Sequence, residues 1–224
     1  MMRRAVVFDI DDTLYLERDY VSSGFAAAGA WARTELGLAD FAERAWLMFQ
    51  EGVRGRIFDE TLAACGARAD GAVVSRLVDV YRAHTPSIEP FPDVAVWMAG
   101  RPDDVAVAVV TDGPLASQRA KAAALGVAAW ADPIVFTEEL GPGRGKPHPA
   151  AFELVEDATG VGGAACAYVA DNPAKDFAGP RSRGWRTVRV RREGGLHATV
   201  ASGDDVDAEI TAFAALNQAL GWSA

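Results

Sequence analysis

The fold is decided by Ala5-Val6-Val7-Phe8-Asp9-Ile10-Asp11-Asp12-Thr13, in which a short apolar run ends in acidic residues. A run of this kind predicts a strand that is buried within a sheet. In open α/β sheets, ligands bind beyond the carboxyl ends of the strands. The carboxylates and the hydroxyl that follow the run are therefore candidates for a functional site.

Segments typical of strands and helices alternate over most of the remaining chain. Short apolar runs predict further strands at residues 105–110, 133–136, 166–170 and 187–190. Helical patterns lie between them, at residues 114–125, 149–157 and 175–183. Such alternation predicts an α/β fold, a doubly wound, mostly parallel, Rossmann-like sheet with helices on both faces.

The segment after the fifth predicted strand indicates one more helix. Asp204 can cap its first turn, because a short polar side chain accepts hydrogen bonds from the free N–H groups there. Four apolar residues then recur at helical spacing, namely Val206, Ile210, Phe213 and Leu216. We therefore expect a helix across roughly residues 204–216.

Residues 16–88 break the alternation of strands and helices. The segment contains no convincing strand, and helical patterns lie near residues 20–36, 40–52, 58–65 and 70–83. More than seventy residues of helix are too many for a simple crossover between two strands. We expect an inserted helical cap at residues 16–88 and a Rossmann-like core formed by residues 1–15 and 89–224.

Composition excludes several classes of function. Half of the 224 residues are hydrophobic, so the chain can bury a sizeable core. The formal net charge of −9 disfavours binding to nucleic acid or to anionic lipid. No apolar run approaches the ~18 residues that cross a bilayer, or forms the roughly 7–15 residue core of a secretory signal near the start. We therefore expect a cytoplasmic monomer or homodimer whose partner is a small molecule rather than nucleic acid or a membrane.

Polar side chains gather at the ends of the predicted strands. In chain order they are Asp9, Asp11, Asp12, Thr13, Thr111, Lys146, Asp171 and Asp176. Carboxylates that converge without a cation repel each other, and Mg²⁺ suits one or two carboxylates together with a phosphate. An ammonium and a hydroxyl remain to bind an anion. The set therefore predicts a site for a phosphoryl group bridged to Mg²⁺. The ammonium is distinctive, because only Lys121, Lys146 and Lys175 are lysines among 22 basic residues.

Four motifs occur in order along the chain. A strand ends in DxDxT at Asp9, another ends in Thr111, Lys146 precedes a proline, and a DxxxxD pair begins at Asp171. This order resembles the haloacid dehalogenase-like hydrolase superfamily over nearly the whole chain. One departure is Ala170, which stands where many members carry glycine and which removes no ligand.

The resemblance implies a catalytic role for two aspartates. Asp9 would be the nucleophile that forms an aspartyl-phosphate. Asp11 would act as the general acid that protonates the leaving oxygen and then as the base that activates water. The implied activity is that of a Mg²⁺-dependent phosphatase acting on a small organic phosphate, either sugar-like or another metabolite.

The resemblance also implies which residues bind the metal and the phosphate. The Mg²⁺ contacts would be the carboxylates of Asp9 and Asp171 and the backbone carbonyl of Asp11, with Asp176 as a further ligand or a neighbour of one. The phosphoryl oxygens would be held by Thr111, the backbone N–H of Asp112, and Lys146. Catalysis would then consist mainly of positioning and charge neutralisation.

The same residues disfavour some of the other activities of the superfamily. Dehalogenases usually lack the second aspartate of the first motif, which is present here as Asp11. Phosphonate hydrolases use a cap lysine to form a Schiff base, and residues 16–88 contain no lysine. Phosphosugar mutases share the core and the cap type, so a mutase is the alternative to a phosphatase.

Two alternatives come from different classes of protein. A phospho-aspartate receiver module also uses a doubly wound sheet with acidic residues, a threonine and a lysine. The chain length and the helical insert oppose that interpretation. A catalytically silent interaction module is disfavoured because Asp9, Asp11, Lys146 and Asp171 are all present.

Overall fold

The computed structural model describes residues 3–221 and divides them into two compact units. One unit contains the chain up to Arg18 and from Ile88 onward, and the other contains Asp19–Ser87. Within the described residues, no helix is both long enough and apolar enough to cross a membrane.

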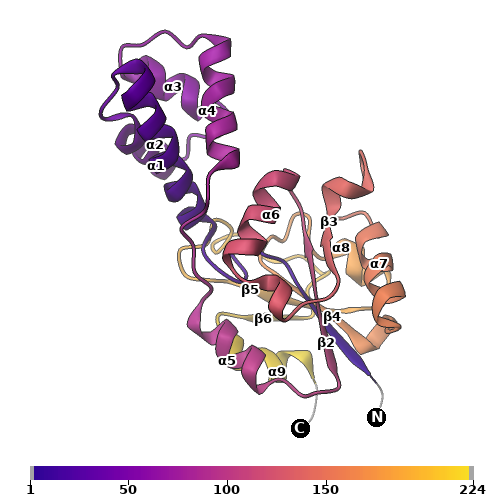
Figure 1. Cartoon of the computed structure of the whole chain (residues 1–224). Helices are drawn as coiled ribbons and strands as arrows, with labels where there is room; N and C mark the ends of the chain where they lie inside the picture. The colour runs from indigo at the N-terminus through magenta and orange to yellow at the C-terminus, as the bar shows by residue number, and fades with distance from the viewer. Residues whose placement is uncertain (1–2, 222–224) are drawn as a thin grey trace. The chain divides into compact units, whose positions relative to one another are not determined.

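A six-stranded sheet forms the centre of the first unit (Figure 1). The strands are β1 (Arg4–Phe8), β2 (Val105–Thr111), β3 (Ile134–Phe136), β4 (Cys166–Ala170), β5 (Arg186–Val190) and β6 (Ala208–Ile210). They lie in the order β3-β2-β1-β4-β5-β6, and every neighbouring pair is parallel. The structure thus confirms the predicted α/β class and the doubly wound, parallel sheet.

Helices cover the sheet of this unit. They are α5 (Pro92–Gly100), α6 (Leu115–Ala124), α7 (Ala150–Thr159), α8 (Ala178–Ser182) and α9 (Leu216–Leu220). Short 3-10 helices lie at Val127–Ala129, Thr137–Leu140, Gly163–Ala165 and Phe213–Ala215. The sequence patterns did not predict α5, which begins at Pro92.

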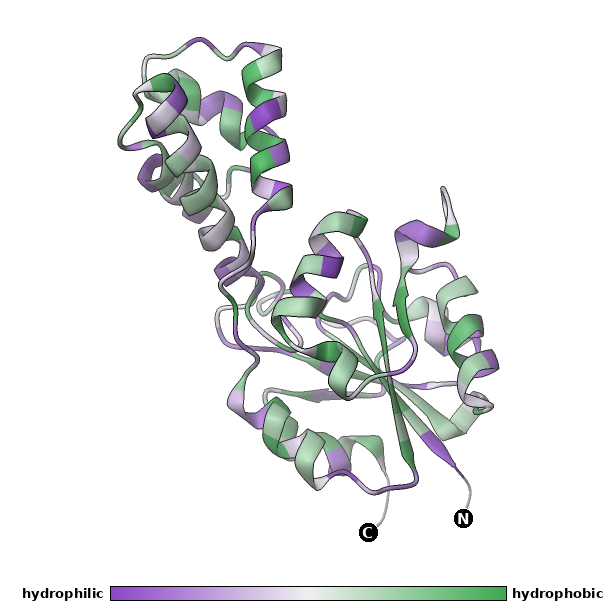
Figure 2. Cartoon of the chain, viewed as in Figure 1, coloured by the Kyte–Doolittle hydropathy of each residue, from purple (hydrophilic) through white to green (hydrophobic). Residues whose placement is uncertain are grey.

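Alternate residues of β1 supply both sides of the core, and Figure 2 shows the apolar strands at its centre. Val7 belongs to a buried cluster with Phe152 of α7. Phe8 lies on the opposite face, where its ring centroid is 5.4 Å from that of Trp97 in α5 and 5.3 Å from that of Phe213. A strand buried on both faces needs apolar residues without interruption, which explains the run that precedes Asp9.

The strand order reverses next to β1. The chain passes from β1 to β2 and β3 on one side, and then returns to β4 on the other side of β1. In doubly wound sheets, ligands bind at the carboxyl ends of the strands where the order reverses. Asp9 after β1 and Asp171 after β4 lie at this reversal.

The helix expected across roughly residues 204–216 is largely wrong. The segment instead forms β6, which pairs in parallel with β5. The Asp207 carboxylate accepts hydrogen bonds from the Thr187 backbone N–H at 2.9 Å and from the Thr187 hydroxyl at 3.1 Å. These bonds fix the segment at the sheet edge, so the α-helix begins only at Leu216.

Four helices build the inserted unit. They are α1 (Glu17–Leu36), which begins in the first unit, then α2 (Phe41–Gln50), α3 (Ile57–Ala64) and α4 (Gly71–Ala83). Aromatic rings from all four form its core, with Phe25, Phe41, Phe58 and Tyr81 packed at centroid distances of 5.8–6.0 Å. A Cβ on Gly29 would lie 2.5 Å from the Cβ of Ala42, so glycine permits the close approach of α1 to the start of α2.

Candidate active site

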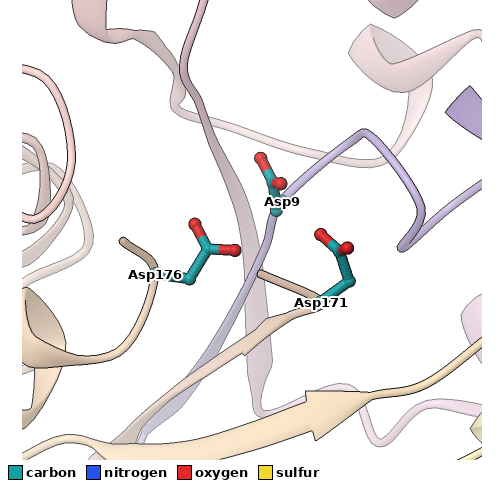
Figure 3. A group of neighbouring side chains, drawn as sticks. All are labelled: Asp9, Asp171 and Asp176. Carbon is teal, nitrogen blue, oxygen red and sulfur yellow. The ribbon is translucent and has the colours of Figure 1, made fainter. Parts of the chain in front are cut away.

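Three carboxylates converge at the carboxyl ends of β1 and β4 (Figure 3). Asp9 follows β1, Asp171 follows β4, and Asp176 lies in the loop before α8. One oxygen of each lies within 4.8 Å of the others, and all three residues are buried. The Asp9 backbone N–H donates to the Val169 carbonyl at 3.0 Å, which continues the sheet pairing and fixes the start of the loop.

Lys146 lies between two of these carboxylates. Its Nζ is 2.9 Å from Asp9 Oδ1 and 2.7 Å from Asp176 Oδ1, and its side chain is fully buried. It also donates to the Tyr168 hydroxyl at 3.1 Å. Burial alone would lower the pKa of this ammonium, but the charges of Asp176 and Asp9 raise that pKa well above its usual range. Lys146 is therefore a fixed positive charge at the centre of the site.

One lysine does not satisfy the three carboxylates. Among the described residues, no donor makes a hydrogen bond of good geometry to Asp9 Oδ1 or Asp176 Oδ1, although Lys146 Nζ is close to both. Burial raises the pKa of Asp9 to about 6, against the attraction of Lys146. Burial and the charge of Asp9 raise the pKa of Asp171 to about 9.

The residues present fit a hard divalent cation. When all three carboxylates are ionised and Lys146 is protonated, the buried group carries two uncompensated negative charges. Buried charges are costly unless they are paired or bind a metal. Carboxylate oxygens are the ligands that Mg²⁺ prefers, and two of the three carboxylates here share the ammonium of Lys146. We call Asp9, Asp171, Asp176 and Lys146 the Lys146 set.

Asp11 lies in a separate group of residues. Lys121 Nζ is 2.7 and 2.8 Å from its two oxygens, the Tyr15 hydroxyl donates to Oδ1 at 2.5 Å, and Gln118 Nε2 donates to Oδ2 at 3.0 Å. The Thr111 hydroxyl donates to Gln118 Oε1 at 2.8 Å. Burial raises the pKa of Asp11, but Lys121 and the hydrogen bonds outweigh it, so this pKa is lowered. We call Asp11, Tyr15, Gln118 and Lys121 the Lys121 set.

Asp112 connects the loops around the site. Its carboxylate accepts from the Thr137 hydroxyl at 2.5 Å and from the Lys146 backbone N–H at 3.3 Å, and it is 3.4 Å from Lys175 Nζ. The side chain therefore ties the loop that carries Lys146 to the end of β2. A cavity of about 400 Å³ opens beside it, lined by Asp112, Gly113, Thr137, Glu138, Gly141, Pro142 and Gly145.

The structure divides the residues proposed from the sequence between two groups. It brings Asp9, Asp171, Asp176 and Lys146 together, and it holds the Asp11 carboxylate with other partners. The phosphate contacts of Thr111, of the Asp112 backbone N–H and of Lys146 stay predictions, as does the metal contact of the Asp11 carbonyl.

Sequence reasoning missed Tyr15, Gln118 and Lys121. One signal was available, because the chain has only three lysines and each lies within 3.4 Å of a carboxylate at these strand ends. Gln118 and Lys121 are also three residues apart, which places them on one face of a helix. The scarcity of lysine would have pointed to Lys121, whereas nothing local singled out Tyr15.

A family model and several curated relatives match this chain. The family model for haloacid dehalogenase-like hydrolases matches residues 3–182. A glyceraldehyde 3-phosphate phosphatase from Methanopyrus kandleri is 32% identical over 201 residues, which cover 85% of each chain. A phosphoserine phosphatase from Thermus thermophilus is 31% identical over 140 residues, which cover 62% of this chain and 55% of the relative.

Solved structures show the same fold at lower identity. A 2-haloacid dehalogenase from Pseudomonas syringae superposes with a TM-score of 0.66 at 23% identity, over 98% of this chain and 99% of that one. The HAD-hydrolase YfnB from Bacillus subtilis, solved bound to magnesium, has a TM-score of 0.68 at 17% identity, over 99% and 100% of the two chains. At such identities the likeness concerns the fold alone.

Proposed function

This chain belongs to the haloacid dehalogenase-like hydrolase family and is a phosphatase of small phosphates, and we propose that Asp9 is its nucleophile. The observation that carries the proposal is the arrangement of the Lys146 set, in which the Asp9 carboxylate lies at a strand end against a buried ammonium. A carboxylate held beside a fixed positive charge stays ionised and can attack phosphorus.

The reaction has two halves. An Asp9 oxygen attacks the phosphorus, the bond between phosphorus and the ester oxygen breaks, and Asp11 supplies a proton to the leaving oxygen. A water oxygen then attacks the aspartyl-phosphate and gives a proton to Asp11. The bond between phosphorus and Asp9 breaks, its electron pair returns to the carboxylate, and inorganic phosphate leaves.

The residues proposed to hold Mg²⁺ are Asp9, Asp171 and Asp176 through their carboxylates, and Asp11 through its backbone carbonyl. When bound, Mg²⁺ would offset the negative charge that these residues share with a phosphoryl group. The chain itself supplies Lys146 as a second positive charge, and it supplies Thr111 and the Asp112 backbone N–H to orient the phosphoryl oxygens. The convergence of three buried carboxylates around one ammonium supports this assignment.

A three-carbon phosphate monoester is the substrate class that we propose. The support is that two relatives, from Methanopyrus kandleri and Methanocaldococcus jannaschii, are named glyceraldehyde 3-phosphate phosphatases and align over about 85% of their length. A phosphosugar mutase would return the phosphoryl group to a sugar and release little phosphate. The cytoplasmic location and the monomeric or homodimeric state stay predictions.

Phosphate release tests the proposal directly. Purified protein is assayed with glyceraldehyde 3-phosphate, phosphoserine and p-nitrophenyl phosphate, with Mg²⁺ and with a chelator. We expect turnover that requires Mg²⁺ and that Asp9→Asn abolishes without loss of the folded state. Asp103→Asn removes the same charge from an exposed position of the same unit and is the matched control. Near wild-type turnover by Asp9→Asn would overturn the assignment of the nucleophile.

A further inference from the structure

Lys121 contributes a buried charge that the proposed reaction leaves without a role. The residue is 3% exposed and lies on α6, which follows β2. Its Nζ contacts both oxygens of Asp11, which lies 110 positions earlier in the sequence. A buried ion pair is weak evidence for stability, because apolar residues of similar volume often stabilise a protein as well or better. Stability alone therefore does not explain why Lys121 is paired with Asp11.

The other members of the Lys121 set restrict the same carboxylate. Tyr15 and Gln118 are also buried, and each donates to one Asp11 oxygen. In this structure, the Thr111 hydroxyl donates to the amide oxygen of Gln118, and the amide nitrogen faces Asp11. Four contacts from three side chains thus fix where the Asp11 oxygens lie.

We propose that Lys121 is a positioning residue that orients the Asp11 carboxylate for the second half of the reaction. This inference rests on the proposed function, because it assumes an aspartyl-phosphate on Asp9. A carboxylate that accepts hydrogen bonds on both oxygens has a fixed orientation. In that half, water attacks phosphorus, its proton passes to Asp11, and the electron pair of the broken phosphorus–oxygen bond returns to Asp9.

The two halves of the reaction can be separated with p-nitrophenyl phosphate. Because p-nitrophenolate leaves without a proton from the enzyme, the first half needs little help from Asp11. A variant impaired only in the second half should release p-nitrophenol in a rapid burst of about one equivalent per active site, followed by slow turnover. A general loss of structure would slow the burst as well.

Lys121→Met tests the inference, and Lys121→Arg and Arg119→Met are compared with it. We expect the burst rate to stay within about 2-fold of wild type while the steady-state rate falls about 10- to 100-fold. Lys121→Arg should recover part of the steady-state rate, because it keeps a positive charge near Asp11. Arg119→Met removes an exposed charge of the same helix that pairs with Glu139, and it should leave both rates unchanged.

A double-mutant cycle shows whether Lys121 acts through Asp11. In Asp11→Asn, the further change Lys121→Met should alter the steady-state rate by less than about 2-fold, because the group that it positions is already lost. A loss of the same size in both backgrounds would overturn the inference. The inference would also be overturned if the burst rate and the steady-state rate of folded Lys121→Met fell together. It would likewise be overturned if the steady-state rate of this variant rose.

Failure of the inference is distinct from failure of the proposed function. If Asp11→Asn gives a burst and Lys121→Met does not, the aspartyl-phosphate stands and the role of Lys121 is wrong. If neither variant gives a burst and Asp9→Asn still turns over, the nucleophile is wrong and the inference falls with it. If Lys121→Met does not fold, Lys121→Gln with the same assay replaces it, and the same outcomes apply.

Discussion

The Lys146 set and the Lys121 set place similar groups in opposite electrostatic situations. In the Lys146 set, three buried carboxylates share one ammonium, and the pKa values of Asp9 and Asp171 are raised. In the Lys121 set, one carboxylate has an ammonium and two further donors, and the pKa of Asp11 is lowered. The first set is therefore incomplete in its charge compensation, whereas the second is already compensated.

The largest effect is expected from removal of the ammonium of the incomplete set. Lys146→Met removes the ammonium that contacts the buried Asp9 and Asp176, and we expect a loss of about 3–5 kcal/mol in the free energy of unfolding without Mg²⁺. Urea denaturation monitored by tryptophan fluorescence measures this loss. Lys175→Met is the matched control, because its partly exposed pair with Asp112 should contribute less than about 1 kcal/mol. Equal losses of unfolding free energy in Lys146→Met and Lys175→Met would contradict the difference that we expect between a buried and a partly exposed lysine.

Magnesium should stabilise the protein more strongly as the pH rises. Raised carboxyl pKa values mean that the metal-free folded state binds protons more tightly than the unfolded chain, so its stability falls as pH rises from about 4 through about 9. Mg²⁺ competes with those protons, and at 100 times its Kd it contributes about 2.7 kcal/mol. Thermal denaturation with and without Mg²⁺ should show a larger shift at about pH 8 than at about pH 5.5. A shift that is equal, or larger at low pH, would contradict the assignment.

Replacement of an aspartate by asparagine should lower Mg²⁺ affinity more in the Lys146 set than in the Lys121 set. Asp171→Asn removes a member of the incomplete set, and we expect Mg²⁺ affinity to fall at least about 10-fold. Asp11→Asn keeps the backbone carbonyl and should change the affinity by less than about 2-fold. Calorimetric titration with Mg²⁺ measures both, and a larger loss in Asp11→Asn would reverse the roles that we assign.

The smallest effect concerns a compensated carboxylate outside the site. Glu156 of α7 accepts from Trp185 Nε1 at 2.7 Å and from the Arg183 guanidinium, and the pairing outweighs burial and lowers its pKa. Glu156→Gln should cost about 1 kcal/mol at neutral pH. Because the folded pKa is lowered, this stability is present above the ordinary value of 4.5 and is lost as the pH falls through the folded pKa. Urea denaturation at two pH values measures it, with the exposed Glu153→Gln as the control. An equal loss of unfolding free energy in Glu156→Gln and Glu153→Gln would contradict the stabilising role that we assign to the contacts of Glu156.

The sequence predicted those features that depend on local pattern and on strand ends. The apolar run before Asp9 indicates a buried strand, and acidic residues after parallel strands meet at one edge of the sheet. The position of Lys146 followed from a motif on a loop. These predictions needed no knowledge of how helices pack.

The features that sequence reasoning missed depend on tertiary contacts. Lys121 meets Asp11 across 110 positions, and the spacing that places it on one helix face with Gln118 does not show that this face meets Asp11. The segment of β6 carries a spacing that also suits a helix, and the bonds between Asp207 and Thr187 decide in favour of the strand. Both features depend on partners that are distant in sequence, and in β6 such partners override the helical periodicity.

A crystal structure with Mg²⁺ and beryllofluoride, a mimic of the phosphoryl group, tests the central claim most directly. We expect the ion among the carboxylates of Asp9, Asp171 and Asp176, and the beryllium attached to an oxygen of Asp9. An ion bound elsewhere, or a mimic attached to Asp11 instead, would contradict the division between an incomplete set that performs the transfer and a compensated set that assists it.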